Sequence, residues 1–301
     1  MYTIELDKVR KSYGRFVAVD DLSFRIEPGS VFGLLGPNGA GKTSTIRMMI
    51  GITAPDSGVV RVFDRPFDRA CLNKIGYLPE ERGLYKKMKM LDQLVFLGEL
   101  HGMPAATARQ KAIEWCIRLE IAEKLGNKVE ELSKGMQQKI QFIAALLHDP
   151  DFIIMDEPFA GLDPVNADLL KNVLLDLKKQ GKTILFSTHR MDQVEKLCDS
   201  ICLINRGKAV LEGNLKQVKA QYGKSNVQIG YDGGDGAFLE QSTLVRSFND
   251  YGNYVEVRLA AGADPQQLLR MVAERSRIHR FELMEPSLEE IFIEVVGKND
   301  A

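Results

Sequence analysis

Three short apolar runs, at residues 31–35, 152–155 and 184–186, interrupt an otherwise mixed sequence of polar and apolar positions. Each run is too short for a helix and lacks the alternation of a strand with one solvated face. Continuous apolar runs of this length are typical of central strands in a parallel sheet that is covered on both sides. Because helix-like segments precede these runs, the pattern predicts an α/β core.

The segments around this core have different patterns. Residues 2–13 and 22–26 resemble antiparallel strands, and residues 201–205 and 208–212 resemble a hairpin around Arg206 and Gly207. We therefore expect antiparallel strands beside the mainly parallel sheet. Between about residues 84 and 147 the apolar positions follow a helical period, which predicts a helical insertion. The residues that share one helical face there are Ala108, Ala112, Trp115, Cys116 and Leu119.

A glycine-rich stretch, GYDGGDG at residues 230–236, predicts a turn or flexible joint before the last part of the chain. Beyond it, strand-like segments at 244–248, 254–259 and 278–283 alternate with helix-like segments at 265–276 and 287–295. The spacing of Ser287 and Glu290 predicts a helix capping box. We therefore expect an α/β domain at residues 1–223, with its insertion at about 84–147, and a small α+β domain at 224–301.

Length and composition agree with two globular domains, because 301 residues exceed one typical domain. The chain is 45% apolar and 27% charged with a formal net charge of -1, so it lacks the basic excess of a nucleic-acid-binding protein. Its apolar stretches fall well short of the ~20 residues that cross a bilayer, and its N-terminus lacks the apolar core of a signal peptide. A cytoplasmic protein without a nucleic-acid partner is expected.

The first candidate site is the sequence GPNGAGKT at residues 36–43, between an apolar run and a helix-compatible segment at 44–50. Glycines let backbone N–H groups turn toward phosphates, a lysine balances their charge, and a hydroxyl can bind magnesium. The segment therefore predicts a phosphate-binding loop for a nucleoside triphosphate. The residues expected to contact the nucleotide are Gly36, Pro37, Asn38, Gly39, Ala40, Gly41, Lys42, Thr43 and Ser44.

Two adjacent carboxylates, Asp156 and Glu157, follow the second apolar run in the sequence FIIMDEPFAGLDP. A strand that ends in such a pair can place the aspartate near a phosphate-bound magnesium and the glutamate near an attacking water. The alternative is a pair of surface acids at a strand end, but that leaves the apolar run before them unexplained. We predict that Asp156 helps to bind the metal and that Glu157 is the general base.

Two further segments are weaker signals when they are taken alone. LSKGMQQK at residues 132–139 opens a helix that Ser133 can cap and at which Gly135 allows close backbone approach, so it is either an anion site or only a cap. His189 follows the third apolar run at the sheet edge where ligands of α/β proteins collect. It could contact a terminal phosphate, although a lone histidine there is usually only a hydrogen-bonded polar residue.

Over about residues 2–222 the chain resembles the ATP-binding cassette (ABC) family, because five motifs occur in the family's order. They are the phosphate loop at 36–43, the signature segment at 132–138, a second Walker motif at 152–157, the GLD turn at 161–163, and His189. The resemblance implies a P-loop NTPase cassette fold, ATP and Mg²⁺ as cofactors, and ATPase activity. It also implies that Tyr13 stacks on adenine, that Lys42 and Thr43 hold phosphates and magnesium, and that Asp163 and His189 link two nucleotide sites and sense the γ-phosphate.

The resemblance further implies a head-to-tail dimer in which Ser133 and Gly135 of one subunit cover ATP on the phosphate loop of the other. Only one cassette is present here, so the second comes from another copy of the chain or from a paralogous ATPase subunit. Two departures from the family pattern occur. Lys134 and Met136 change a signature that is commonly LSGGQ, and Glu80 stands where a glutamine normally joins the metal site to the membrane subunit. Glu80 can still meet magnesium or its water.

The signature form, the segment PEERGLY and the tail EPSLEEIFIEVVG are similar to ATPase subunits of bacterial multicomponent exporters, including sodium and drug efflux types. This similarity implies separately encoded polytopic permease subunits and a peripheral position on the inner face of the membrane. A groove for the permease is expected at Leu84, Tyr85, Met88 and Met90, although burial within the insertion would explain the same residues. The C-terminal domain is expected to be an interaction or regulatory module.

Two other classes of protein fit the sequence less well. A soluble cassette that acts as a mechanical switch on ribosomes or DNA is the alternative function, but such relatives usually carry two cassettes or long coiled coils, and neither is visible in this sequence. A small GTPase is disfavoured, because the sequence NKVE at residues 127–130 only imitates a guanine-specifying NKxD motif. Transport therefore remains the leading prediction.

Overall fold

The computed structural model describes residues 1–81, 83–223, 226–232 and 237–299, and it divides into two compact units. Unit 1 spans Met1–Asn214 and unit 2 spans Leu215–Ala301. This division falls earlier in the chain than the boundary expected at residue 223.

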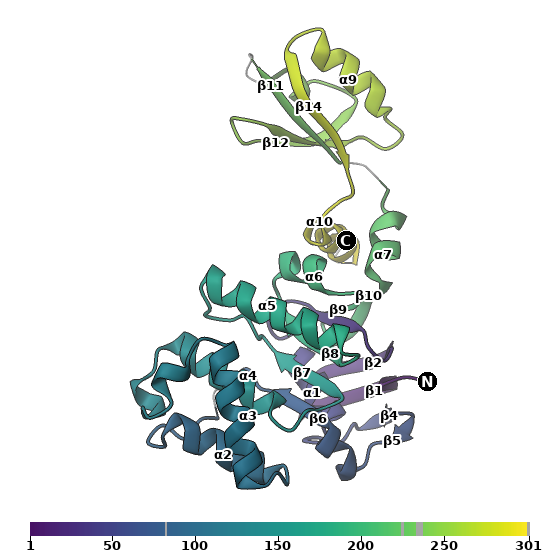
Figure 1. Cartoon of the computed structure of the whole chain (residues 1–301). Helices are drawn as coiled ribbons and strands as arrows, with labels where there is room; N and C mark the ends of the chain where they lie inside the picture. The colour runs from purple at the N-terminus through teal and green to yellow at the C-terminus, as the bar shows by residue number, and fades with distance from the viewer. Residues whose placement is uncertain (82, 224–225, 233–236, 300–301) are drawn as a thin grey trace. The chain divides into compact units, whose positions relative to one another are not determined.

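Unit 1 is built on a six-stranded sheet with the order β10-β9-β3-β8-β7-β6 (Figure 1). Strands β3 (Val31–Leu35), β7 (Phe152–Asp156) and β8 (Thr183–Thr188) are buried along their whole length, as their apolar runs predict. They run parallel to one another and to β6 (Ile75–Leu78) and β9 (Ser200–Asn205). The antiparallel strand β10 (Lys208–Asn214) completes the predicted hairpin with β9, so the α/β core is confirmed.

A second sheet, with the order β2-β1-β4-β5, supplies the predicted antiparallel flank. Its strands are β1 (Ile4–Tyr13), β2 (Phe16–Ile26), β4 (Ser57–Val62) and the short β5 (Arg65–Pro66). One hydrophobic cluster joins this sheet to the parallel sheet through the helix α1 (Lys42–Met49), and it includes the stacked rings of Phe24 and Phe32. The helix that follows the phosphate loop is therefore fixed by a shared core.

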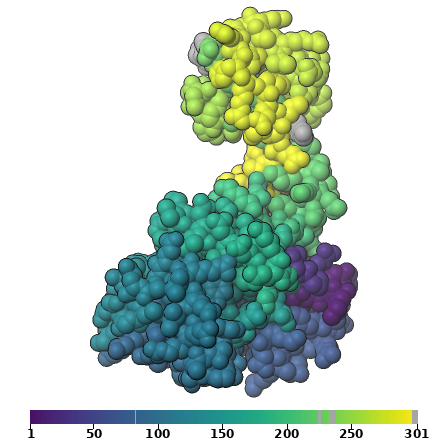
Figure 2. Space-filling model, viewed as in Figure 1, coloured from purple at the N-terminus to yellow at the C-terminus, as the bar shows by residue number. Residues whose placement is uncertain are grey.

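The helical insertion consists of α2 (Met90–Leu100), α3 (Ala105–Arg118) and α4 (Lys134–Leu146), with short 3-10 turns between them. In Figure 2 this segment, coloured blue to teal, forms a continuous region of the surface of unit 1. Ala108, Ala112, Cys116 and Leu119 are fully buried, as their helical spacing predicts, whereas Trp115 on the same predicted face is only partly buried. Helices α5 (Pro164–Lys179) and α6 (Met191–Leu197) return the chain to the sheet. Among the described residues, no helix combines the length and the apolar character that spanning a bilayer requires.

Unit 2 begins with α7 (Leu215–Gln221) and contains an antiparallel sheet with the order β12-β13-β11-β14. Its elements are β11 (Asn226–Asp232), α8 (Ala237–Glu240), β12 (Val245–Asp250), β13 (Val255–Leu259), α9 (Pro265–Ala273), β14 (Arg277–Met284) and α10 (Leu288–Asn299). The succession β-α-β-β-α-β with this strand order is ferredoxin-like, which agrees with the predicted α+β class.

Two details of unit 2 bear on the sequence predictions. The capping box of α10 is confirmed, since the Glu290 N–H donates to Ser287 Oγ and the Ser287 N–H donates to the Glu290 carboxylate. The predicted joint at residues 230–236 is wrong for residues 230–232, which continue strand β11 because Val227 and Ile229 anchor that strand in the core. Residues 233–236 lie outside the described part of the chain.

Candidate functional site

The loop at residues 36–41 connects the end of β3 to the start of α1, and close backbone contacts require two of its glycines. Gly36 has φ +150°, and a Cβ placed there would lie 2.2 Å from the carbonyl oxygen of Ile204. Gly41 has φ +111°, and its Cβ would lie 2.4 Å from the carbonyl oxygen of Ala18. No L side chain fits either position without moving the backbone, so both positions require glycine.

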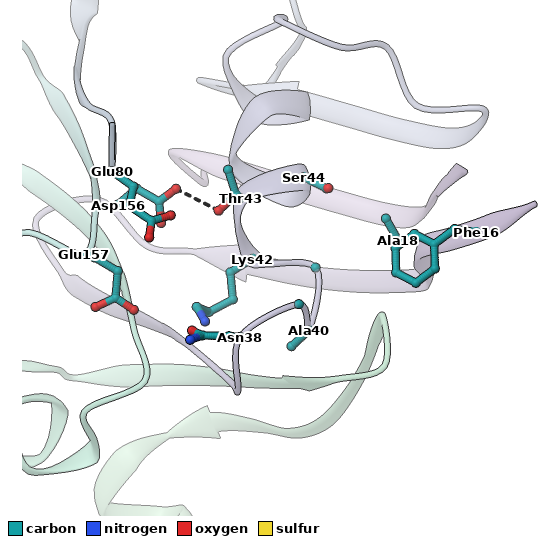
Figure 3. Close-up of a pocket in the computed structure, with 12 residues that line it drawn as sticks. Phe16, Ala18, Asn38, Ala40, Lys42, Thr43, Ser44, Glu80, Asp156 and Glu157 are labelled. Carbon is teal, nitrogen blue, oxygen red and sulfur yellow. Dashed lines mark hydrogen bonds between the residues drawn. The ribbon is translucent and has the colours of Figure 1, made fainter. Parts of the chain in front are cut away.

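The loop encloses a cavity of about 280 Å³, whose lining residues are drawn in Figure 3. The predicted residues Asn38, Gly39, Ala40, Gly41, Lys42, Thr43, Ser44, Glu80, Asp156 and Glu157 line it, together with Phe16 and Ala18. The structure therefore brings the loop, both carboxylates that follow the apolar run of β7, and Glu80 into one space. Phe16 and Ala18 were not singled out from the sequence.

Lys42 is the first residue of α1, and its side chain folds back onto the loop. Its Nζ donates to the carbonyl oxygens of Gly36 at 2.8 Å and Pro37 at 3.2 Å. Burial lowers the pKa of Lys42, and the nearby carboxylates of Glu157, Asp156 and Glu80 oppose that shift. The ammonium group is thus held beside three acids and away from bulk water.

Asp156 is the most buried acid of the cavity, with 1% of its surface exposed. Thr43 Oγ1 donates to Asp156 Oδ2 at 2.9 Å, the dashed contact in Figure 3, and Ser187 Oγ donates to Asp156 Oδ1. These contacts place a hydroxyl and a carboxylate side by side, which are hard oxygen ligands of the kind that Mg²⁺ prefers. The donor set therefore fits a magnesium ion.

Ser187 was missed by the sequence analysis. It lies directly opposite Asp156 in the register of β7 and β8, and it is fully buried. Its position directly after the apolar run at residues 184–186 was the one available signal, and only the strand pairing gives it a meaning.

Glu157 follows Asp156 at a positive φ of 50°, which turns its side chain away from the strand direction. His189 Nδ1 lies 2.8 Å from Glu157 Oε1, the His189 N–H donates to the same oxygen at 3.1 Å, and Thr188 Oγ1 donates to Oε2 at 3.2 Å. Because an ionised carboxylate only accepts hydrogen bonds, the His189 ring carries its proton on Nδ1. The structure therefore brings His189 and Glu157 together at the sheet edge.

Three other predicted residues lie elsewhere in unit 1. Ser133 caps α4, since the Met136 N–H donates to its Oγ at 3.2 Å, and Gly135 lies in the first turn of that helix. Asp163 caps α5, and the Asn166 backbone and side-chain N–H groups that donate to it lower its pKa. Among the described residues that line the phosphate-loop cavity, none of these three occurs.

Tyr13 ends β1 and lies opposite Phe16 in the register of the β1–β2 hairpin. Its side chain is 42% exposed, and the Lys11 ammonium lies 5.8 Å from the ring centre. Phe16 rather than Tyr13 lines the cavity, although the two rings belong to the same cross-strand pair.

A separate groove of about 400 Å³ lies in unit 1, and Pro79, which precedes Glu80 in the chain, lines it. Leu84 lines it with Ile52, Leu72, Leu97 and His101, so the residue expected there from the sequence is present. Met90 is fully buried at the start of α2 and cannot line a groove, because the first turn of that helix faces the core. Tyr85 and Met88 line a different hollow.

Comparison with known proteins agrees with this geometry. Residues 19–160 match the family described as ABC transporter, and residues 213–296 match the family described as ATP-binding protein DrrA1-3-like, C-terminal domain. The uncharacterized ABC transporter ATP-binding protein YhaQ of Bacillus subtilis (strain 168) is 47% identical over 294 residues, which is 98% of each chain. The Nod factor export ATP-binding protein I of Paraburkholderia xenovorans (strain LB400) is 42% identical over 213 residues, 70% of each chain.

A solved structure of an ATP-binding subunit of an ABC transporter superposes on the chain with a TM-score of 0.68 and 28% identity. The match covers 73% of this chain and 93% of the other. The predicted cassette fold is therefore confirmed by a second and independent comparison.

Proposed function

The chain belongs to the family of ABC transporter ATP-binding subunits and hydrolyses ATP, and we propose that it drives separately encoded membrane subunits in export. The observation that carries the site assignment is the meeting of Thr43, Asp156 and Glu157 in the phosphate-loop cavity. The loop residues 36–44 would bind the triphosphate, and Tyr13 with Phe16 would contact the base.

The residues Thr43, Asp156 and Glu80 would hold Mg²⁺, because all three offer oxygen ligands to the same cavity. When bound, the ion would neutralise part of the charge on the phosphates. Glu157 would orient and deprotonate the attacking water, since three hydrogen-bond donors fix its carboxylate. His189 donates to this carboxylate through Nδ1, and a terminal phosphate would compete with the carboxylate for this ring.

Hydrolysis would require two chains in a head-to-tail arrangement. In support, Ser133 and Gly135 stand at the start of α4, where backbone N–H groups can bind an anion, yet they do not line the described cavity of their own chain. A second copy of this chain, or a paralogous ATPase, would present that helix to the bound ATP.

A mixing experiment tests this arrangement. Lys42→Ala and Ser133→Arg should each abolish ATPase activity alone, but a mixture should recover part of it. In a mixed head-to-tail dimer one nucleotide site combines both defects and the other combines neither. The matched control is a mixture of two chains. One chain carries both Lys42→Ala and Ser133→Arg, and the other is the inactive Glu157→Gln chain. A mixture without activity would show that Ser133 acts on its own chain's nucleotide or in no nucleotide site.

The groove at Leu84 would receive a segment of the permease, which would hold the chain at the inner face of the cell membrane. Its apolar lining suits the apolar face of a helix, and its neighbour Glu80 belongs to the nucleotide cavity. Movement of the bound segment could thus alter the metal site. The export direction rests on the name of the Nod factor relative.

Affinity purification from detergent-solubilised native membranes, followed by mass spectrometry, tests the assignment to a transporter. A polytopic membrane protein in stoichiometric amount is the expected result. Leu84→Ala should weaken its recovery while ATP binding persists. Recovery from the soluble fraction alone, with ribosomal proteins or no partner, would instead favour the mechanical switch.

Unit 2 would serve assembly or regulation rather than nucleotide binding. Its described residues carry a ferredoxin-like sheet, and the residues that form the nucleotide cavity all belong to unit 1. A chain that ends after residue 223 should therefore still bind ATP. Loss of ATP binding by a truncated chain that is still folded would contradict this division.

A further inference from the structure

A second hollow in unit 1, of about 660 Å³, has a mixed basic and aromatic lining. Tyr85, Lys86, Lys87, Met88 and Phe96 line it, and Lys89 follows in the chain. We call these six residues the basic-aromatic surface. None of them belongs to the nucleotide cavity or lines the groove at Leu84.

The lysines give this surface a local positive charge beside two exposed acids, Asp92 in the first turn of α2 and Glu130, whose N–H contacts Lys86. Lys86, Lys87 and Lys89 are exposed, and none of them forms an ion pair with a described residue. Residues 83–91 contain these lysines and no acid. The whole chain has a net charge of -1, so attraction to an anion must come from a local cluster of this kind.

The aromatic part is exposed at Tyr85 and partly buried at Phe96. Tyr85 keeps 56% of its surface accessible and meets Phe96 edge to face, with 5.9 Å between the ring centres. Leu100 lies one turn after Phe96 on α2 and is 66% exposed. Apolar side chains of this size are costly to leave in water, and here they stand beside lysines.

The backbone under this surface is fixed. The Glu130 N–H donates to the carbonyl oxygen of Lys86 at 3.0 Å, and the Val129 N–H donates to that of Met88 at 3.0 Å. The side chains therefore project from a rigid platform, with their ammonium groups free to move. Such a platform suits a broad anionic surface better than one carboxylate, which needs fixed and partly buried donors.

We propose that the basic-aromatic surface binds the anionic lipid surface of the membrane directly. Lysines flanking aromatic and aliphatic side chains are the composition of interfacial membrane contacts, in which the charges meet headgroups and the rings enter the interface. This contact would concentrate the chain at the membrane before it meets a permease. It does not depend on the permease docking proposed above.

Vesicle flotation of the purified full chain tests the proposal without any permease. Vesicles that contain phosphatidylglycerol and phosphatidylcholine in equal parts should carry the chain, and vesicles of phosphatidylcholine alone should not. Each lysine near an anionic surface contributes roughly fivefold to binding, so Lys86→Gln, Lys87→Gln and Lys89→Gln together should weaken it by about 150-fold. Added salt should also weaken the binding of the unchanged chain to these vesicles.

The matched control neutralises three exposed lysines on other elements, Lys8, Lys179 and Lys208, and should leave vesicle binding unchanged. Tyr85→Ser should weaken binding by a smaller factor, and ATP affinity should stay the same in every variant. Equal flotation of the two triple variants would overturn the proposal. A second result would also overturn it: the unchanged chain does not bind anionic vesicles, and the variant at Lys86, Lys87 and Lys89 no longer recovers the permease. The surface would then bind an acidic protein segment.

Discussion

Replacing Ser187 by alanine should weaken the metal site without touching a nucleotide contact. Ser187 is fully buried, and its Oγ donates to Asp156 Oδ1 while Thr43 donates to the other oxygen of that carboxylate. The Glu157 N–H lies 3.3 Å from the same Ser187 Oγ. Alanine removes the hydroxyl and leaves one oxygen of a buried acid without this donor.

The size of the effect follows from these contacts. A hydrogen bond to a charged group contributes about 1.5–3 kcal/mol, so Ser187→Ala should lower the free energy of unfolding by about 2 kcal/mol. In a unit of this size that corresponds to a fall in Tm of about 4–8 °C. Loss of a hydrogen-bond partner behind a metal ligand typically weakens metal affinity by about 10–100-fold. Titration calorimetry of ATP binding at a series of Mg²⁺ concentrations measures this second effect.

Thr183→Val is the matched control, because it removes a buried hydroxyl from the other end of the same strand. Thr183 Oγ1 accepts from the Gly29 N–H at 3.0 Å and lies far from the nucleotide cavity in the register of β8. Both variants should lose stability, but only Ser187→Ala should need more Mg²⁺ for ATP binding. An equal Mg²⁺ requirement in the two variants would refute the role given to Ser187.

Three further predictions concern single positions. Gly36→Ala should cost more than about 3 kcal/mol in denaturant unfolding because of its clash with Ile204, whereas Gly39→Ala, at φ +79° with open space around it, should cost only about 1 kcal/mol. Glu80→Gln should retain ATPase activity, because an amide oxygen can also meet the metal or its water; near-total loss would mean that the carboxylate is essential. Burial lowers the pKa of His148 to about 4, so the unfolded chain takes up a proton at this ring before the folded chain does as the pH falls. The free energy of unfolding should therefore decrease by about 1–2 kcal/mol as the pH falls from 6.5 to about 4, since the ring is only partly buried. His148→Gln should flatten that slope in urea titrations at pH 5 and pH 7.

Local patterns predicted the parts of the fold that depend on burial alone. The apolar runs became β3, β7 and β8 because a strand covered on both faces holds mostly apolar side chains. The same reasoning predicted the helical face of α3, whose small residues are buried. The phosphate loop could be located because its chemistry needs glycine, lysine and a hydroxyl at fixed spacing.

Contacts between distant segments were beyond the reach of the sequence. Ser187 meets Asp156 through the register of two strands, and Phe16 faces the cavity through a cross-strand pair with Tyr13. Neither register leaves a local trace. Met90 was expected in a groove because methionine suits adaptable contacts, but the direction of α2 turns it into the core.

The hydrogen bonds of the nucleotide site suggest what ATP binding must change. Lys42 binds two carbonyl oxygens of its own loop, and Glu157 binds Thr188 and His189. The two groups that the proposed chemistry needs are therefore already satisfied within the chain. A triphosphate would draw Lys42 away from the carbonyl oxygens, and its terminal phosphate would compete with Glu157 for His189. Part of the binding free energy would thus be used to free the Glu157 carboxylate. The carboxylate would then be available to deprotonate water only when a γ-phosphate is present.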